Sequence, residues 1–235
     1  MKITEQQFFD YISCPLKYDM KYNKGIVIDD KFSVNNILIK VTNYFYMYVI
    51  NNLKTPSMNQ LTTKFESLIK PYMNIISNKQ YTDALFLLRN FYNWACSNKI
   101  AVIDSDVKYL FSHNGNIIEG VLNPIAINKD KNLEFLIMNF SNRVPDQLEI
   151  DTKLKYSLDM LAFNSSNKDK KIYASKIHCV KQNKDFTTTR NENDYSRLLS
   201  TIDNVCKGIE NNIYFPHETH MCQQCQYRNL CRGWK

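Results

Sequence analysis

Three cysteines lie close together near the end of this 235-residue chain and limit what it can fold into more than any other feature. Cys222, Cys225 and Cys231 follow the pattern Cys-x2-Cys-x5-Cys. A two-residue spacer lets two thiolates turn toward one metal centre, and five further residues allow a short helical return of the third. The spacing therefore predicts a metal site in the C-terminal tail.

Such a site needs a fourth ligand, and we considered two kinds of metal beside a metal-free tail. A cubane iron-sulfur cluster takes four thiolates, and Cys14, which is followed by proline, is the best remaining candidate. A structural zinc ion could instead use His217 or His220 and leave Cys14 as a buried helix cysteine. We favour the 4Fe-4S cluster. The remaining cysteines fall in apolar helix or strand segments and are expected in the core: Cys96, Cys179 and Cys206.

Composition points to a globular protein of a reducing compartment. Seven cysteines, an odd number with lopsided spacing, do not suggest a disulfide framework. No run of about 18 apolar residues is present, and the first residues lack the features of a secretory signal. We therefore expect a location in the cytoplasm or another reducing intracellular compartment, including that of a viral or phage protein in its host cell, and no membrane partner. The net charge of +7 favours a polyanionic partner such as nucleic acid.

The spacing of apolar residues predicts helices first and a sheet second. Helical spacing before residue 100 covers 5–22, with a break at Cys14, and then 32–53, 61–76 and 82–96. Short runs rich in Ile, Val, Leu and Phe predict a meander of three strands over 101–111, 116–128 and 133–140. Two more helices, 148–163 and 194–213, enclose a fourth strand at 171–180. This order predicts an α/β fold with a mixed central sheet flanked by helices.

The two ends of the chain together resemble a known family. A lone cysteine within Phe-Phe-Asp-Tyr-Ile-Ser-Cys-Pro-Leu-Lys-Tyr, residues 8–18, combined with the C-terminal cysteine pattern resembles the iron-sulfur branch of the PD-(D/E)XK nucleases. This branch includes the RecB-like and AddB-type exonucleases and their CRISPR-adaptation relatives. The resemblance implies one domain over 1–235, with a helical part over 1–100, a sheet core over 101–180 and a helix with a cysteine-rich tail over 181–235. It also implies that a cluster on the four cysteines pins the termini together.

The same resemblance places the catalytic positions on residues that lack the required charge. The family binds a divalent cation, Mg²⁺ or Mn²⁺, on carboxylates and adds a lysine. Its first acid ends a Gly-x-x-Asp turn in the second strand, where this chain reads Gly-Val-Leu-Asn and ends at Asn123. Its Asp/Glu-x-Lys motif in the third strand falls on Asn139 and Ser141. Because neutral amides bind magnesium far more weakly than carboxylates do, we expect the site to hold the cation poorly and the usual catalysis to be lost.

Other positions were weighed as remnants of a nuclease site. The family's upstream histidine corresponds to Asn35 or Asn36. Asp106-Val107-Lys108 spells Asp-x-Lys, but it falls in the first predicted strand with no Gly-x-x-Asp before it, so we interpret it as a decoy. The acids that could form a displaced site are Asp104, Asp106 and Glu119.

Basic and aromatic residues could contact nucleic acid. The helix after the third strand carries Lys153, Lys155 and Tyr156 where the family has a glutamine and a tyrosine, and its lysines could bind phosphate or simply form a solvated face. Arg143 and Arg228 are further predicted contacts near the DNA path that the resemblance implies. Two aromatic residues could stack on a base or cover the cluster: Tyr227 and Trp234.

Our preferred hypothesis is a catalytically inactive relative of the iron-sulfur nucleases. It would bind DNA or dock on a larger replication, recombination or transcription complex, with helicase, polymerase or recombination subunits as partners. Two alternatives belong to other classes. One is an active metal-dependent DNA exonuclease with relocated acids, and the other is a zinc-stapled protein-interaction module.

Overall fold

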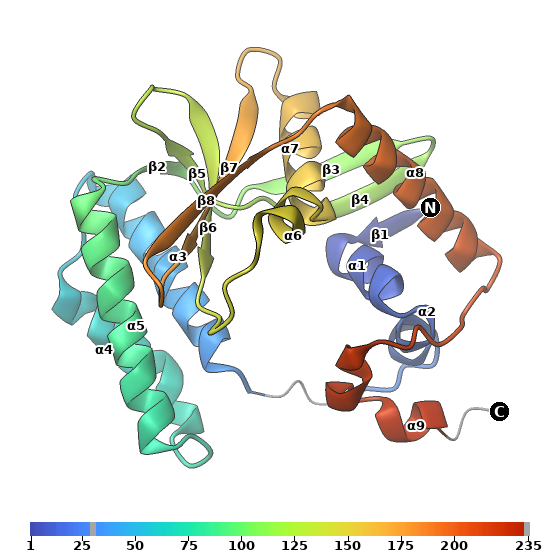
Figure 1. Cartoon of the computed structure of the whole chain (residues 1–235), viewed down its shortest axis with the longest axis horizontal. Coiled ribbons are helices and arrows are strands. Elements are labelled where there is room, and N and C mark those ends of the chain that lie inside the picture. Colours follow the sequence, from blue (N-terminus) through green and yellow to red (C-terminus); the bar gives the residue numbers. More distant parts are fainter. Residues whose placement is uncertain (29–31, 233–235) are drawn as a thin grey trace. The chain divides into compact units, whose positions relative to one another are not determined.

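A computed structural model describes residues 1–28 and 32–232, which form two compact units (Figure 1). The first unit comprises Met1–Lys31, Lys108–Gly120 and Tyr195–Lys235, and the second comprises Phe32–Val107 and Val121–Asp194. The chain thus passes between the units four times. Whether the two units make one domain stays a prediction.

The first unit contains both ends of the chain. It begins with β1 (Lys2–Thr4), α1 (Glu5–Ser13), α2 (Pro15–Tyr18) and a π-helical turn, η1 (Asp19–Asn23). Thr4 caps α1 by accepting a hydrogen bond from the Gln7 N–H, while the Gln7 side chain accepts one from the Thr4 N–H. The predicted break is confirmed, because Cys14 is extended between the two helices and Pro15 opens α2, where its missing N–H costs nothing.

A small sheet and the C-terminal helices complete this unit. The sheet has the order β1-β4-β3, with β3 (Lys108–His113) and β4 (Asn116–Val121), and β1 pairs in parallel with β4. Gly120 allows close packing here, since an added Cβ would lie 2.5 Å from Glu5 Oε2 and 2.7 Å from the Tyr109 hydroxyl. The long helix α8 (Glu192–Glu210) leads to a 3-10 turn, η3 (His220–Gln224), and to α9 (Arg228–Arg232).

The second unit is built on a five-stranded sheet. Its order is β2-β5-β6-β7-β8, and β6 and β7 are parallel while the other pairs are antiparallel. The strands are β2 (Ala101–Asp104), β5 (Ile125–Ile127), β6 (Leu133–Asn139), β7 (Ile172–Cys179) and β8 (Lys184–Thr189). The sheet is therefore mixed, as predicted.

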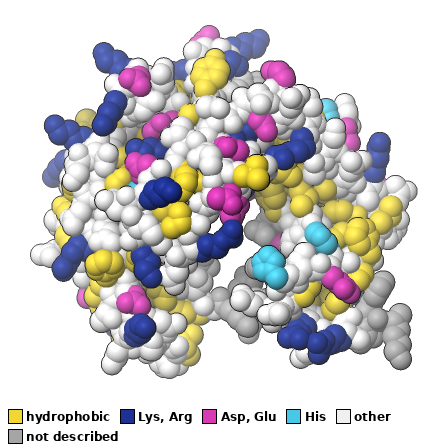
Figure 2. All heavy atoms as spheres, viewed as in Figure 1, with side chains coloured by type: hydrophobic (Ala, Val, Ile, Leu, Met, Phe, Trp, Pro, Cys, Tyr) yellow, Lys and Arg dark blue, Asp and Glu magenta, His cyan; other side chains and the backbone are white. Residues whose placement is uncertain are grey.

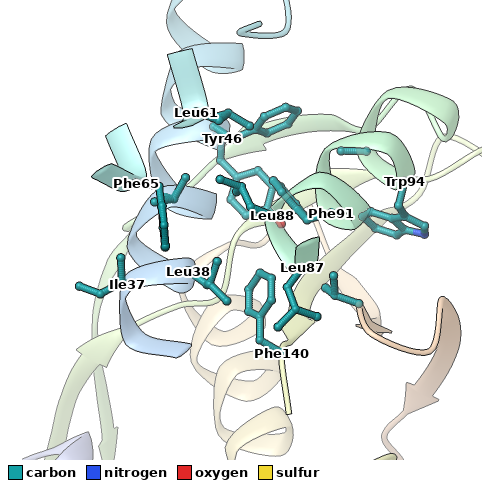
Figure 3. Close-up of a cluster of buried hydrophobic side chains, with 14 of the residues drawn as sticks. Ile37, Leu38, Tyr46, Leu61, Phe65, Leu87, Leu88, Phe91, Trp94 and Phe140 are labelled. Carbon is teal, nitrogen blue, oxygen red and sulfur yellow. The ribbon is translucent and has the colours of Figure 1, made fainter. Parts of the chain in front are cut away.

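Helices cover both faces of this sheet. On one face lie α3 (Val34–Asn52), α4 (Met58–Ile69) with the short η2 (Lys70–Tyr72), and α5 (Asn78–Ser97). Figure 3 shows part of their core, in which Phe91, Leu88 and Leu38 are fully buried beside Phe140. On the other face lie α6 (Gln147–Asp151) and α7 (Leu154–Ser166), where Ile150 and Tyr156 pack with Ile177. Alternation along β6 explains this division, because successive side chains point to opposite faces.

Several expected elements are corrected. The single strands predicted over 101–111 and 116–128 are each broken in two, the first near Asp106, which has φ +60°, and the second at Pro124, so a three-stranded meander does not form. The Asp-x-Lys decoy lies at this first break, outside the interior of any strand. Strands β1 and β8 were not predicted. Throughout the described part of the chain, no helix has the length and apolarity needed to cross a membrane.

Candidate catalytic pocket and cysteine group

A cavity of about 280 Å³ lies at the carboxyl end of β6, beside α6 and the start of α7, all within the second unit. Asn139 and Ser141, two of the three residues predicted to replace catalytic ones, line it. Asn123 does not. The remaining lining residues are Ile137, Met138, Arg143, Pro145, Glu149, Ile150, Lys153, Tyr156 and Ile177.

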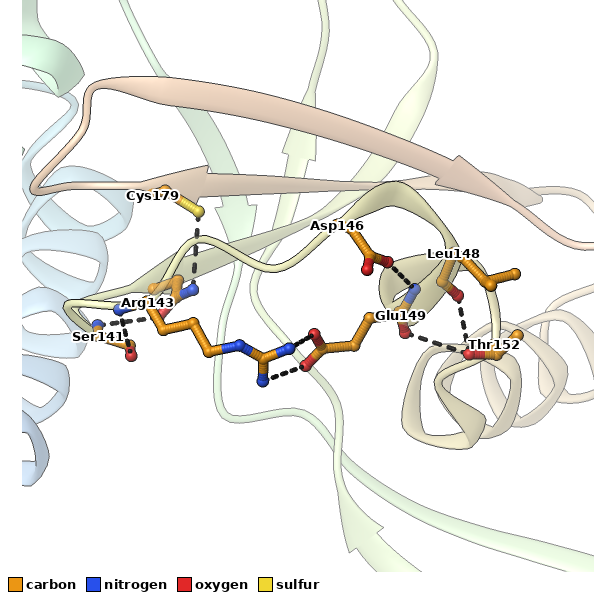
Figure 4. Close-up of polar contacts among 8 residues, drawn as sticks. Ser141, Arg143, Asp146, Leu148, Glu149, Thr152 and Cys179 are labelled. Carbon is orange, nitrogen blue, oxygen red and sulfur yellow. Dashed lines mark hydrogen bonds and ion pairs between the residues drawn. The ribbon is translucent and has the colours of Figure 1, made fainter.

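The polar atoms of Asn139 and Ser141 are used inside the protein. Asn139 Oδ1 accepts a hydrogen bond from the Ser141 N–H at 2.9 Å, and its Nδ2 lies 3.6 Å from Cys179 Sγ (Figure 4). Ser141 Oγ accepts from the Arg143 N–H at 3.1 Å. Burial raises the pKa of the Cys179 thiol, against the effect of the Asn139 hydrogen bond. The segment after β6 is therefore held by its own side chains.

An ion pair between Arg143 and Glu149 forms part of the wall of this cavity. The Arg143 guanidinium donates two hydrogen bonds to the Glu149 carboxylate, at 2.6 and 3.4 Å, as Figure 4 shows. Asp146 fixes the start of α6 by accepting from the Glu149 N–H at 2.7 Å. The pair is largely exposed, and exposed pairs are weak, so an incoming anion could compete with Glu149 for Arg143.

Asn123, predicted from the resemblance to replace the first acid, belongs to a separate network around a buried carboxylate. Its Nδ2 donates to Asp159 Oδ2 at 2.5 Å. Lys155 Nζ donates to Asp159 Oδ1 at 2.5 Å and to the Val121 carbonyl at 3.2 Å. The Asp159 side chain is only 1% exposed. One buried carboxylate is thus paired with an ammonium group and an amide.

The predicted nucleic-acid contacts at the start of α7 differ in their access to solvent. Lys153 lines the cavity, with Nζ 5.5 Å from the centre of the Tyr156 ring. Tyr156 is buried, and burial raises its pKa to about 12 although Arg190 opposes the shift. Lys155 has its ammonium group engaged by Asp159. Of these predicted contacts, Arg143 and Lys153 are the cations that face the cavity.

The residues proposed as remnants or relocated acids do not gather at this pocket. Asp104 and Asp106 are exposed at the end of β2 and beyond it, and Glu119 on β4 pairs with Lys2 at 2.8 Å. Asn35 and Asn36 are located in the first turn of α3. Within residues 1–28 and 32–232, no three His, Cys, Asp or Glu side chains come close enough together to hold one metal ion.

The four predicted cluster cysteines lie in the first unit around one apolar group. Cys14, Cys225 and Cys231 pack against this group, and Cys222 is exposed. Burial raises the pKa of the Cys231 thiol, and the nearby thiols of the other three cysteines raise it further. The other three sulfurs therefore lie within electrostatic range of Cys231. The apolar group consists of Leu16, Met20 and Tyr227, with Ile26 and Ile28.

Backbone N–H groups of the segment before η3 point at two of these sulfurs. The His217 N–H donates to Cys14 Sγ, and the Thr219 N–H donates to Cys222 Sγ, both at 3.4 Å. The segment is tied to the N-terminal helices by two more bonds, from the Leu16 N–H to the Phe215 carbonyl and from the Tyr11 hydroxyl to the Ile213 carbonyl. The two ends of the chain therefore meet at these cysteines.

The histidines, aromatic residues and arginine predicted to lie near the cysteines have the following positions. His217 Nδ1 lies 3.1 Å from the Ser13 carbonyl oxygen, and His220 is exposed in η3. Tyr227 is buried, and its hydroxyl donates to the Ile26 carbonyl at 3.0 Å. Arg228 is exposed at the start of α9. Trp234 lies outside the described residues.

Comparison with known proteins supports the fold but gives no family. No family profile and no curated protein matches the sequence. The structure is similar to the crystal structure of a candidate exonuclease from Eubacterium rectale, with a TM-score of 0.54 and 11% identity over 100% of this chain and 88% of that chain. The crystal structure of SSO0001 covers 93% of this chain and 94% of its own at 10% identity, but its TM-score of 0.37 carries no argument. The chain therefore has a nuclease-like α/β fold.

Three residues at these sites were not foreseen from the sequence. Asp159 interrupts the apolar stretch from Leu158 to Ala162, and an acid in such a position is a usable signal of a buried pair. Glu149 and Cys179 carry no such signal, because their partners Arg143 and Asn139 are identified only by the folded chain.

Proposed function

We propose that this protein is a catalytically inactive, iron-sulfur PD-(D/E)XK nuclease-like protein that binds DNA or docks on a larger complex. The observation that carries the proposal is the pairing of Asp159 with both Asn123 and Lys155. At the family's first acidic position, an amide now donates a hydrogen bond to a carboxylate that an ammonium group already neutralises. Replication, recombination or transcription are the processes that such a complex would serve.

The chemistry of this network opposes metal-dependent cleavage. A divalent cation prefers anionic oxygens, and Asp159 is the carboxylate of this network. A cation bound there would have to displace the Lys155 ammonium from the buried Asp159 carboxylate, and breaking such a pair costs several kcal/mol. Asn139 adds no compensation, since its carbonyl oxygen already accepts from Ser141.

The cysteine group supports a four-iron cluster more than a zinc ion. Tetrahedral zinc with bonds of about 2.3 Å requires sulfurs about 3.8 Å apart, whereas a cubane gives each thiolate its own iron and so a wider spacing. The thiols of Cys14, Cys222 and Cys225 lie within electrostatic range of Cys231, which gives the four thiolates that a cubane takes. The N–H groups aimed at Cys14 and Cys222, and the apolar side chains packed against Cys14, Cys225 and Cys231, suit cluster-bound thiolates. When bound, the cluster would supply structural cross-linking of the termini.

A nuclease assay tests the catalytic part of the proposal. We expect no degradation of single- or double-stranded DNA with Mg²⁺ or Mn²⁺ above that of a preparation carrying Asp159→Asn. Manganese-dependent degradation that is abolished by Asp106→Asn and unaffected by Asn139→Ala would instead establish the alternative of an active exonuclease with relocated acids.

Metal analysis of anaerobically purified protein tests the cofactor. We expect a brown preparation with absorbance near about 400 nm and about four irons per chain. One zinc per chain without iron would support the zinc-stapled interaction module. Absence of DNA binding with an intact cluster would remove the nucleic-acid role and leave docking on a protein complex.

A further inference from the structure

Two loops of the second unit carry nearly the same five residues. The loop between β5 and β6 reads Asn-Lys-Asp-Lys-Asn, residues 128–132, and the loop between α7 and β7 reads Asn-Lys-Asp-Lys-Lys, residues 167–171. Each loop leads directly into a strand. The first residues of these strands, Leu133 and Ile172, are paired in the parallel β6–β7 register. The two similar loops therefore lie side by side at the amino-terminal ends of β6 and β7.

A third lysine-bearing turn lies at the same end of the sheet. Lys99 precedes β2, and Ala101 in β2 pairs with Ile127, which in turn pairs with Leu133. The loops before β6 and β7 are the two at the top of Figure 1, and Figure 2 shows dark blue Lys and Arg side chains over that region. Three strand spacings separate β2 from β7 in the sheet. Because neighbouring strands are about 4.8 Å apart, these lysines are spread over about 14 Å.

These three segments hold most of the net charge of the chain. Their lysines are all exposed, and the segments contain two acidic residues, so together they carry a net charge of +4 against +7 for the whole chain. In the part of the chain that the structure describes, none of these ammonium groups is in an ion pair, and only that of Lys171 has a hydrogen bond, to the Asn164 carbonyl at 2.7 Å. We call this set the lysine loops: Lys99, Lys129, Lys131, Lys168, Lys170 and Lys171.

The loops are held in shape by their own asparagines. Asn128 Oδ1 accepts from the N–H groups of Asp130 and Asn132, both at 3.0 Å. In the second loop, the Asn167 side chain donates to the Phe163 carbonyl at 2.8 Å, and Asn164 bonds both backbone groups of Ile172. Ordered turns lower the entropy lost when the lysines bind a partner.

We propose that the lysine loops form a binding surface for the phosphate backbone of a nucleic-acid duplex. A row of positive charges about 14 Å long matches about four nucleotides of one DNA strand, at about 3.4 Å of helix axis each. Lysine neutralises phosphate without reading the base sequence. The surface lies at the opposite end of β6 from the cavity, about 20 Å away at 3.3 Å per residue. The inference rests on the proposed function only for the choice of DNA as partner, since it moves the main contacts away from Arg143 and Lys153.

Salt-dependent binding of a fluorescent DNA duplex of about 20 base pairs, in EDTA, tests this surface. One variant carries Lys129→Gln, Lys131→Gln, Lys168→Gln and Lys170→Gln. We expect its affinity to fall at least about tenfold at about 0.1 M salt, and the slope of log K against log salt to shrink by about 0.9 for each phosphate that is no longer neutralised, about 3 to 4 in all. Thermal unfolding should be unchanged, because the four ammonium groups make no hydrogen bond or ion pair within the described chain.

A control of equal charge separates local binding from net charge. It carries the same change at four exposed lysines of the helical part, and we expect less than about a threefold effect on its affinity. An equal loss in both variants would overturn the inference. The control positions are Lys40, Lys54, Lys70 and Lys79.

A pocket variant with Arg143→Gln and Lys153→Gln distinguishes the two proposals. If it loses DNA binding while the lysine-loop variant keeps it, the inference is wrong and the proposed DNA role of the pocket survives. If wild-type protein binds no DNA, both nucleic-acid proposals fail. Competition by poly-glutamate as strong as that by DNA of the same charge would assign the lysine loops to an acidic protein partner instead.

Discussion

The residues at the predicted catalytic positions and the cysteine group differ in how their polar atoms are hydrogen-bonded. Around Asn123, Asn139 and Ser141, side-chain donors and acceptors are satisfied by one another or by neighbouring backbone. Around Cys231, by contrast, burial and then the neighbouring thiols raise the pKa of its thiol, and the sulfurs of Cys14 and Cys222 have long hydrogen bonds of 3.4 to 3.7 Å with backbone groups. This difference fits our proposal that the second site binds a ligand, and the following variants test that proposal.

The largest effect expected from breaking this contrast comes from the cysteines. Cys231→Ser should remove the cluster colour and lower the free energy of unfolding by about 4 kcal/mol or more, because a link between Cys14 and the tail closes a loop of more than about 100 residues. Anaerobic urea denaturation with iron analysis measures both effects. Cys96→Ser, at a half-buried helix position, is the matched control and should keep its iron. Full iron content in Cys231→Ser would contradict the ligand set.

A buried ion group beside Cys14 should give the next largest effect. Asp10 is 3% exposed and accepts hydrogen bonds from Lys17, Lys21 and Tyr22 at 3.0, 2.9 and 2.8 Å. Burial would raise the pKa of Asp10, but these hydrogen bonds outweigh it and lower the pKa. Asp10→Asn should cost about 2 to 4 kcal/mol, somewhat less than a fully buried pair because both lysines reach solvent.

The pH dependence checks the cause of this loss. Since the pKa of Asp10 is lower in the folded chain, its contribution to stability is present above about pH 3.9 and is lost as pH falls through the folded-state value. The difference in unfolding free energy between wild type and Asp10→Asn should therefore shrink at acid pH. A difference that is constant with pH would mean that Asp10 acts through packing alone.

Introducing an acid at Asn123, where the resemblance predicts one, tests the first of the two compared sites. Asn123→Asp would place a second carboxylate against Asp159, with Lys155 to neutralise both, and should cost about 1 to 3 kcal/mol at neutral pH. The loss should diminish as pH falls, because the two carboxylates can then share a proton. Chemical denaturation at several pH values measures this.

The double variant Asn123→Asp with Asp159→Asn supplies the control. It exchanges the two groups and should recover most of the stability, giving a favourable coupling in a double-mutant cycle. If Asn123→Asp alone were as stable as wild type and bound Mn²⁺, then Asp159 and Lys155 would not prevent a metal ion from binding at this position.

The sequence predicts local structure better than the pairing of distant residues. Pro15 after Cys14 ends one helix and begins another, so the break between α1 and α2 is readable from the chain. Strand β8 is not readable, because Phe186 is its one apolar residue among polar neighbours on a sheet edge. The break at Asp106 depends on a positive φ, which Asp adopts more readily than most residues other than glycine but which the apolar pattern does not specify.

The sites divide in the same way. The spacing of Cys222, Cys225 and Cys231 is local, so the sequence identifies these three predicted ligands, and in the structure their segment lies beside Cys14. The Asn123–Asp159 contact joins residues 36 positions apart, and the side chain of Asn123 alone does not reveal that its partner is a carboxylate rather than a metal. Physical pairing over such distances comes from the sheet and helix packing, which periodicity does not specify.

The smallest expected effect concerns His178, one of the buried residues of the second unit that have an unpartnered side-chain atom. His178 on β7 is buried and stacked 4.0 Å from Trp94, with Nδ1 2.6 Å from Asp185 Oδ1, yet its Nε2 has no hydrogen-bond partner in the described chain. Burial lowers the pKa of His178, Asp185 opposes the shift, and Lys176 adds to it. The unfolded chain therefore takes up this proton more readily than the folded chain does.

It follows that acid should weaken the fold through His178. The free energy of unfolding should fall by about 1 kcal/mol as pH drops from about 7.5 through the unfolded-state value near 6.5, and His178→Asn should remove this part of the decline. His113→Asn is the comparison, because His113 lies 3.4 Å from Asp203 in the first unit and its replacement should leave the decline in place. A decline equal to wild type in His178→Asn would contradict the assignment of this acid sensitivity to His178.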